Sequence, residues 1–139
     1  HTDLVWRPGA AELLRAVHQA GIPAALVTST HRRLTEIALN LIGRQHFAAT
    51  VCGDEVGHPK PHPDPYLTAL SQLGVQAGDS VAIEDSPLGI ASAEAAGCAV
   101  IAVPGDIPIA PAPTRVVIDS MRSLGVERLE QILHQIRTA

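Results

Sequence analysis

Residues 80–103 read SVAIEDSPLGIASAEAAGCAVIAV, and this stretch contains the pattern of a complete strand–helix–strand unit. An apolar run that ends at Glu84 predicts one strand, and a second apolar run over residues 99–103 predicts another. The Asp-Ser-Pro that follows Glu84 is typical of a helix cap with proline in the first turn, and Gly97 ends that helix. Two strands joined in this way through a helix pair in parallel.

The rest of the chain repeats this alternation. Further strands are predicted at residues 24–27, 48–52 and 115–118, and further helices at 9–20, 31–41, 65–73 and 125–136. Alternating strands and helices predict an α/β fold, a Rossmann-like parallel sheet with flanking helices. At 139 residues the chain is long enough for one domain, which we take as residues 1–139.

The composition agrees with a buried parallel sheet. Hydrophobic residues make up 46% of the chain but aromatic residues only 2%, so Ala, Val, Leu and Ile must form the core. The predicted helix at 31–41 carries Leu34, Ile37, Ala38 and Leu41 at helical spacing, which indicates an amphipathic helix.

Charge and cysteine content exclude several classes of protein. The formal net charge is −4 and no run of basic residues forms a stripe, so nucleic acid is not an expected partner. Cys52 and Cys98 lie in apolar stretches far apart in the sequence, and we expect free buried thiols, as in a cytoplasmic protein. We find no signal peptide pattern and no apolar run long enough to span a membrane.

Ligands of parallel sheets bind beyond the carboxyl ends of the strands, so the residues that follow each strand matter most. Thr28 and Ser29 follow the first strand and precede a helix. A hydroxyl and free backbone N–H groups at that place can bind a phosphate oxygen. The same residues could also simply cap the helix.

Lys60, the only lysine in the chain, lies in a loop in which four prolines restrict the backbone. An ammonium group held there can neutralise a phosphoryl group or a carboxylate, although a solvated surface lysine is an equal alternative. His58 and His62 lie on either side of it. Because the loop is not a helix, we do not expect their spacing to bring them together as metal ligands, and we interpret them as surface histidines.

Glu84 and Asp85 end the third strand. Two adjacent acids at the mouth of a sheet are unfavourable unless they are paired or bind a cation. Mg²⁺ prefers oxygen ligands of this kind together with water and substrate phosphate. The simpler alternative is that Asp85 only caps the following helix.

Three segments resemble the haloacid dehalogenase-like hydrolases, and most closely the group that contains β-phosphoglucomutase and small sugar-phosphate phosphatases. They read RPGAAELLRAVHQAGIPAALVTST (residues 7–30), GDEVGHPKPHPDPYLTAL (53–70) and SVAIEDSPLGIASAEAAGC (80–98). Their order and spacing are specific to that superfamily.

The resemblance implies a role for each polar residue at the strand ends. Thr28 would be the phosphate-binding hydroxyl, and Ser29 would offer its backbone N–H. Lys60 would stabilise the nucleophile and the transferred phosphoryl group. Asp85 would be a ligand of Mg²⁺, and Glu84 beside it would help hold the metal shell.

The chain also departs from the family pattern. The aspartate-rich DxDGT motif, whose first Asp attacks phosphorus, does not occur in these 139 residues. In the family that motif and a helical cap domain precede the segment with which this chain starts, and its strand lies centrally in the sheet. We therefore expect a partial core, a fragment or one piece of a larger polypeptide, with exposed strand edges that favour association.

The resemblance predicts a parent protein that hydrolyses or transfers the phosphate of a small phosphorylated metabolite through an aspartyl-phosphate. Two alternatives stay open: an inert fragment or binding module, and a dehalogenase of the same fold. A dinucleotide-dependent oxidoreductase is disfavoured because no strand is followed by the glycine-rich turn.

Overall fold

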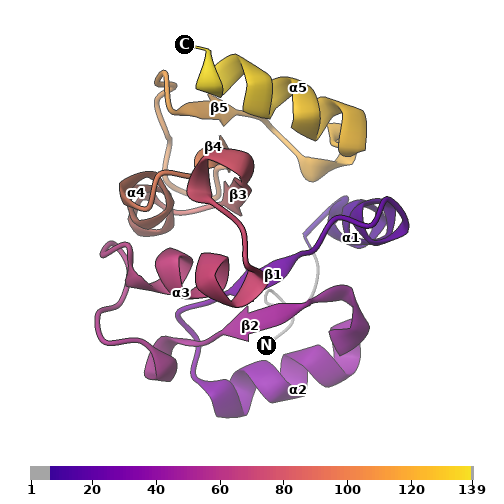
Figure 1. Ribbon diagram of the computed structural model, residues 1–139, viewed down its shortest axis with the longest axis vertical. Helices are drawn as coiled ribbons and strands as arrows, with labels where there is room; N and C mark the ends of the chain where they lie inside the picture. Colours follow the sequence, from indigo (N-terminus) through magenta and orange to yellow (C-terminus); the bar gives the residue numbers. More distant parts are fainter. Residues whose placement is uncertain (1–6, 139) are drawn as a thin grey trace.

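The computed structural model describes residues 7–138, in which helices and strands alternate as the sequence predicts (Figure 1). Each predicted strand and helix is confirmed, and no end differs by more than one residue. The order is α1 (Ala10–Gln19), β1 (Ala25–Val27), α2 (Arg32–Ile42), β2 (Ala49–Val51), α3 (Asp64–Leu73), β3 (Val81–Glu84), α4 (Pro87–Ala95), β4 (Ala99–Ala102), β5 (Arg115–Val117) and α5 (Val126–Arg137).

The strands pair in parallel but form two separate sheets. β1 pairs with β2, and β3, β4 and β5 form the second sheet in that order. Within residues 7–138, β1 and β3 therefore each have one edge without a strand partner. All three residues of β1 are partly exposed. This agrees with the expectation of exposed strand edges in a partial sheet.

β4 lies at the centre of the larger sheet and is buried on both faces. Val100 and Ala102 belong to one buried cluster, whereas Ile101 and Val103 belong to another. Alternate residues of a strand point to opposite faces, so the two clusters cover the two sides of the sheet. In Figure 1, α3 and α4 lie on one side of these strands and α1 and α5 on the other.

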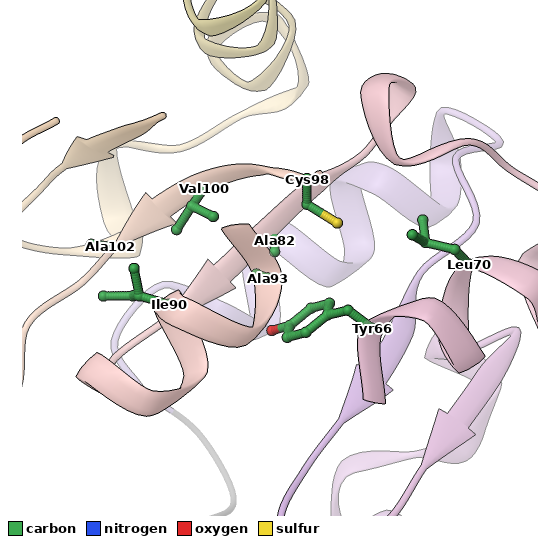
Figure 2. Close-up of a cluster of buried hydrophobic side chains, with 8 residues drawn as sticks. All are labelled: Tyr66, Leu70, Ala82, Ile90, Ala93, Cys98, Val100 and Ala102. Atoms are coloured by element: carbon green, nitrogen blue, oxygen red, sulfur yellow. The ribbon is translucent and has the colours of Figure 1, made fainter. Parts of the chain in front are cut away.

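The cluster on the α3 and α4 side is built from aliphatic residues and one cysteine around one aromatic ring. Figure 2 shows Tyr66 extending from α3 toward α4. Ala93 of α4 is fully buried, which lets the helix backbone approach the sheet closely. The members of the cluster are Tyr66, Leu70, Ala82, Ile90, Ala93, Cys98, Val100 and Ala102.

Both cysteines are free and buried, as predicted. Burial raises the pKa of each thiol, which keeps the thiols protonated. None of the helices between residues 7 and 138 combines the length and the apolar character that a bilayer crossing requires.

Helix α2 packs through a different stripe from the apolar one that its sequence shows. Thr35 and Leu39 are buried, at 3% and 1% exposed, whereas Leu34, Ile37 and Leu41 are 56%, 56% and 70% exposed. Arg32 lies on the same face of the helix as these two buried residues, because it precedes Thr35 by three positions and Leu39 by seven.

Arg32 explains this orientation. Its guanidinium donates to the hydroxyl and the backbone carbonyl of Thr50 in β2, at 2.8 and 3.0 Å, and to Glu55 at 2.7 Å. These bonds hold the first turn of α2 against β2. The 32–35–39 stripe therefore faces the strand, and the apolar 34–37–41 stripe is turned outward.

Replacing Leu39 with Ala should lower the free energy of unfolding by about 2–5 kcal/mol, because a buried side chain leaves a cavity. Leu41→Ala, seven-tenths exposed in the same helix, should change it by less than about 0.5 kcal/mol. Urea unfolding followed by circular dichroism measures both. Equal losses in the two variants would contradict the observed orientation of α2.

The Arg32–Glu55 pair also predicts a response to acid. The pKa of Glu55 is lowered from 4.5 to about 2, and the hydrogen bond from Arg32 is the largest cause of this change. A carboxylate with a lowered pKa stabilises the fold above its unfolded pKa, and this contribution is lost as the pH falls from about 4.5 toward 2. Glu55→Gln should therefore flatten the pH dependence of unfolding in that window. The matched change Glu130→Gln, at an exposed position of α5, should leave it unchanged.

Candidate active site

The side chain of Lys60 connects the ends of the two sheets. It reaches from the proline-rich loop between β2 and α3 and is only 11% exposed. Its ammonium nitrogen Nζ donates to the backbone oxygen of Val27 at 3.1 Å and to Glu84 Oε2 at 2.7 Å. Val27 is the last residue of β1 and Glu84 the last of β3. The ammonium group therefore lies between the carboxyl ends of two strands that are not paired with each other.

A residue of α3 donates a second hydrogen bond to the Glu84 carboxylate. The hydroxyl of Tyr66 donates a short hydrogen bond to the same Oε2, and the Lys60 ammonium lies 5.5 Å from the centre of the Tyr66 ring. Burial, reinforced by the Glu84 carboxylate, raises the pKa of Tyr66, so the hydroxyl keeps its proton. Two donors satisfy a carboxylate that is only 7% exposed and would otherwise be costly to bury. Sequence reasoning missed Tyr66, although it is the only tyrosine in the chain.

Gly89 makes room for the Glu84 carboxylate. A Cβ at position 89 would lie 1.9 Å from Glu84 Oε1, much closer than any real contact. The backbone N–H of Gly89 donates to Ser86 Oγ at 3.2 Å, and Ser86 is the N-cap of α4. Ser86, not Asp85, thus caps this helix, and the carboxylate of Asp85 is not used for capping.

Asp85 lies at the rim of the sheet, with half of its side chain exposed. Arg7, which sequence reasoning did not single out, contacts Asp85 Oδ2 through Nη1 at 2.8 Å. Exposed ion pairs of this kind contribute at most about 1 kcal/mol to the stability of the fold. A ligand of Asp85 could therefore replace the Arg7 guanidinium with little loss of stability.

Thr28 and Ser29 form the turn directly after β1. The Thr28 hydroxyl oxygen accepts from the backbone N–H of Thr30 at 3.1 Å. The N-cap of α2 is His31, so Thr28 orders the turn and does not cap the helix. Gly53 lies against this turn, since a Cβ there would be 2.1 Å from the Ser29 backbone oxygen. The turn is thus fixed between β1 and the segment that follows β2.

The predicted residues gather at one edge of the molecule. Thr28 directly follows the Val27 carbonyl that accepts from Lys60, and Asp85 directly follows Glu84. Two surface hollows of the described chain lie elsewhere, one beside α4 and residues 108–110 and the other beside β2. The gathered residues do not line either of these hollows.

The interpretation of the loop histidines needs a correction. His58 and His62 are exposed, as expected of surface residues, but the loop does bring them together. Their rings stack with centroids 4.3 Å apart. The expectation that their spacing in a loop would not bring them together was wrong, because the chain between them makes a turn in which the His62 N–H donates to the Pro59 carbonyl.

Comparison with known proteins gives a consistent result. A family model described as haloacid dehalogenase-like hydrolase matches residues 1–103. Hexitol phosphatase A of Escherichia coli (strain K12) is 40% identical over 103 residues, which is 73% of this chain and 48% of that protein. The plasmid protein CbbY of Cupriavidus necator is 39% identical over 102 residues, 70% of this chain and 40% of that protein. The chain thus spans about half the length of the curated relatives that it matches.

Solved structures match over most of the chain. The crystal structure of CbbY from Rhodobacter sphaeroides in complex with phosphate superposes with a TM-score of 0.80 at 36% identity, over 89% of this chain and 58% of that one. β-Phosphoglucomutase from Clostridium difficile gives a TM-score of 0.83 at 23% identity, over 96% of this chain and 58% of that one. The second match concerns the fold alone.

The close contact at Gly89 predicts a specific effect of substitution. Gly89→Ala should lower the free energy of unfolding by about 1–3 kcal/mol, because the new methyl group displaces the Glu84 carboxylate from Lys60 and Tyr66. This loss should appear in spite of the higher helix propensity of alanine. Gly78→Ala, where nothing lies within 4 Å of the new Cβ, is the control. If both variants unfold at the wild-type urea concentration, Gly89 does not shape the Glu84 site.

Proposed function

Since this chain belongs to the haloacid dehalogenase-like hydrolases, we propose that the protein containing it hydrolyses or transfers the phosphoryl group of a small phosphate monoester. The observation that carries the proposal is the position of the Lys60 ammonium between the ends of β1 and β3. The names of the relatives favour this chemistry over dehalogenation, since they include hexitol phosphatase A and validoxylamine A 7'-phosphate phosphatase.

Lys60 would neutralise charge at the reacting centre. A phosphoryl group carries its charge on peripheral oxygens, and a fixed cation stabilises that charge best when it need not reorganise. The ammonium group already has two fixed acceptors, Val27 O and Glu84 Oε2, and one of its three N–H donors remains for a substrate oxygen or a nucleophile. We therefore assign Glu84 the role of orienting Lys60, in addition to helping hold the metal shell.

Thr28 and Ser29 would bind the phosphoryl oxygens. The Thr28 hydroxyl oxygen accepts from the Thr30 N–H, which leaves its own proton free to donate to a phosphate oxygen. Backbone N–H groups of the turn before α2 add a favourable dipole for an anion. Thr28 directly follows Val27, whose carbonyl accepts from Lys60.

Asp85 has the properties of a Mg²⁺ ligand. Its carboxylate is half exposed at the end of β3, and only Oδ2 is in contact with Arg7. A hard cation prefers such oxygen ligands and usually keeps several waters, for which a half-exposed carboxylate leaves room. When bound there, Mg²⁺ would neutralise the charge of the phosphate. Asp85 and Glu84 are the residues of this chain that we assign to its shell.

The nucleophile would come from a strand between β1 and β3. Each of these strands has an edge that is unpaired within the described part of the chain, and Lys60 spans the two. A parallel strand inserted there would bring its carboxyl end to Lys60. We propose that a further segment of the parent polypeptide supplies this strand and its aspartate, and that the 139-residue chain alone is inactive.

Charge removal in the parent protein tests the assignment. Lys60→Met and Asp85→Asn should each lower kcat/KM for phosphate monoesters in the presence of Mg²⁺ by about 30- to 150-fold. This corresponds to the loss of one charge-assisted contact, on the order of 2–3 kcal/mol. Arg33→Ala, which removes an exposed positive charge on α2, should leave the rate unchanged.

A double variant separates catalysis from folding. Lys60→Met leaves Glu84 buried without its cation, so this variant can also lose stability. Lys60→Met/Glu84→Gln removes both charges and should recover much of the stability but none of the activity. Full activity in either Lys60 variant, with thermal unfolding measured in parallel, would overturn the catalytic assignment.

A further inference from the structure

The loop that carries Lys60 also gathers three potential metal ligands on its outer side. One ligand atom from each of His58, His62 and Asp64 lies within 4.8 Å of the other two. The proposed phosphate site uses none of these side chains, because Lys60 points inward to Glu84 while both histidines are exposed. This group, the His58–His62–Asp64 cluster, therefore needs a separate explanation.

The two imidazoles converge on one carboxylate. His58 Nδ1 lies 2.8 Å from Asp64 Oδ2, and His62 Nδ1 lies 3.3 Å from Asp64 Oδ1. The rings are stacked with an interplanar angle of 23°, and one nitrogen of each ring lies within 4.8 Å of the other.

The ring nitrogen Nδ1 of His62 lies close to two atoms of Asp64. It accepts a hydrogen bond from the backbone N–H of Asp64 at 3.1 Å and lies 3.3 Å from Asp64 Oδ1. A cation bound through Nδ1 would replace this hydrogen bond and lie beside the carboxylate. Deprotonated imidazole nitrogen and ionised carboxylate are the forms that bind metals.

The backbone holds the cluster in place. The carbonyl of His62 accepts from Ser92 Oγ at 2.7 Å, and Ser92 is fully buried in α4. The His62 N–H donates to the carbonyl of Pro59 at 2.9 Å. Asp64 is the first residue of α3 and does not cap it, since Pro63 is the N-cap. Its carboxylate is turned to the histidines instead.

We propose that His58, His62 and Asp64 form a binding site for a divalent cation of the Zn²⁺ type. Two imidazole nitrogens and one carboxylate oxygen match the ligands that Zn²⁺, Co²⁺ and Ni²⁺ accept, and water would fill the remaining positions. Mg²⁺ is a poor fit because it prefers an all-oxygen shell. The site is distinct from the Asp85 rim and does not depend on the phosphoryl chemistry proposed above.

Titration of the untagged protein with ZnCl₂ by isothermal calorimetry tests the proposal. We expect one Zn²⁺ per chain, undiminished by millimolar Mg²⁺, and an increase in Tm on binding. Loss of a group that only supports a ligand typically weakens metal binding 10–100-fold, so His62→Gln or Asp64→Asn should weaken it at least about tenfold. His58→Gln/His62→Gln should abolish the Zn²⁺-dependent increase in Tm.

His134→Gln is the matched control, because it removes an exposed histidine from α5. It should bind Zn²⁺ as the wild type does. The absorption spectrum of bound Co²⁺ reports the ligands directly and should lose its visible bands in the double histidine variant. Unfolding of each variant without metal shows whether the fold is kept. The proposal fails if the double variant binds Zn²⁺ as tightly as the wild type, or if no Zn²⁺ binds.

Discussion

The buried ion pair between Lys60 and Glu84 is the interaction on which the arrangement of this edge depends. The two sheets share no strand pairing within residues 7–138, so other contacts must hold their ends together. Lys60 does so by donating to the last residue of β1 and to the last residue of β3. A buried pair has this effect only when its desolvation is offset by good geometry and further hydrogen bonds. Tyr66 provides such a bond to the Glu84 carboxylate.

Several residue choices around the pair follow from its burial. Gly89 is required because any side chain would occupy the space of Glu84 Oε1. Ser86 rather than Asp85 caps α4, so the half-exposed carboxylate of Asp85 is not used for capping. The carboxylate of Glu84 is thus buried against Lys60, whereas that of Asp85 is half exposed. This division suits a centre in which one group positions a cationic side chain and the other faces a ligand.

The loop between β2 and α3 performs two tasks with one backbone. Its inner side directs Lys60 to the strand ends, and its outer side gathers His58, His62 and Asp64. Ser92 anchors the loop through the carbonyl of His62. A restricted backbone of this kind reduces the entropy lost when a ligand orders the side chains, on either side of the loop.

The order of strands and helices, their ends and the α/β class could be read from the sequence alone, because they depend on local patterns. The apolar runs that end at Glu84 and begin at Ala99 and the glycine after α4 are such patterns. The choice of Thr28, Lys60 and the Glu84–Asp85 pair as candidates also came from their places after strands.

Other features depended on contacts between residues distant in sequence. Tyr66 and Gly89 matter only because α3 and α4 meet Glu84, and the rotation of α2 depends on Arg32 reaching β2. Helical spacing reports which residues share a face, but only the tertiary structure decides which face meets the sheet.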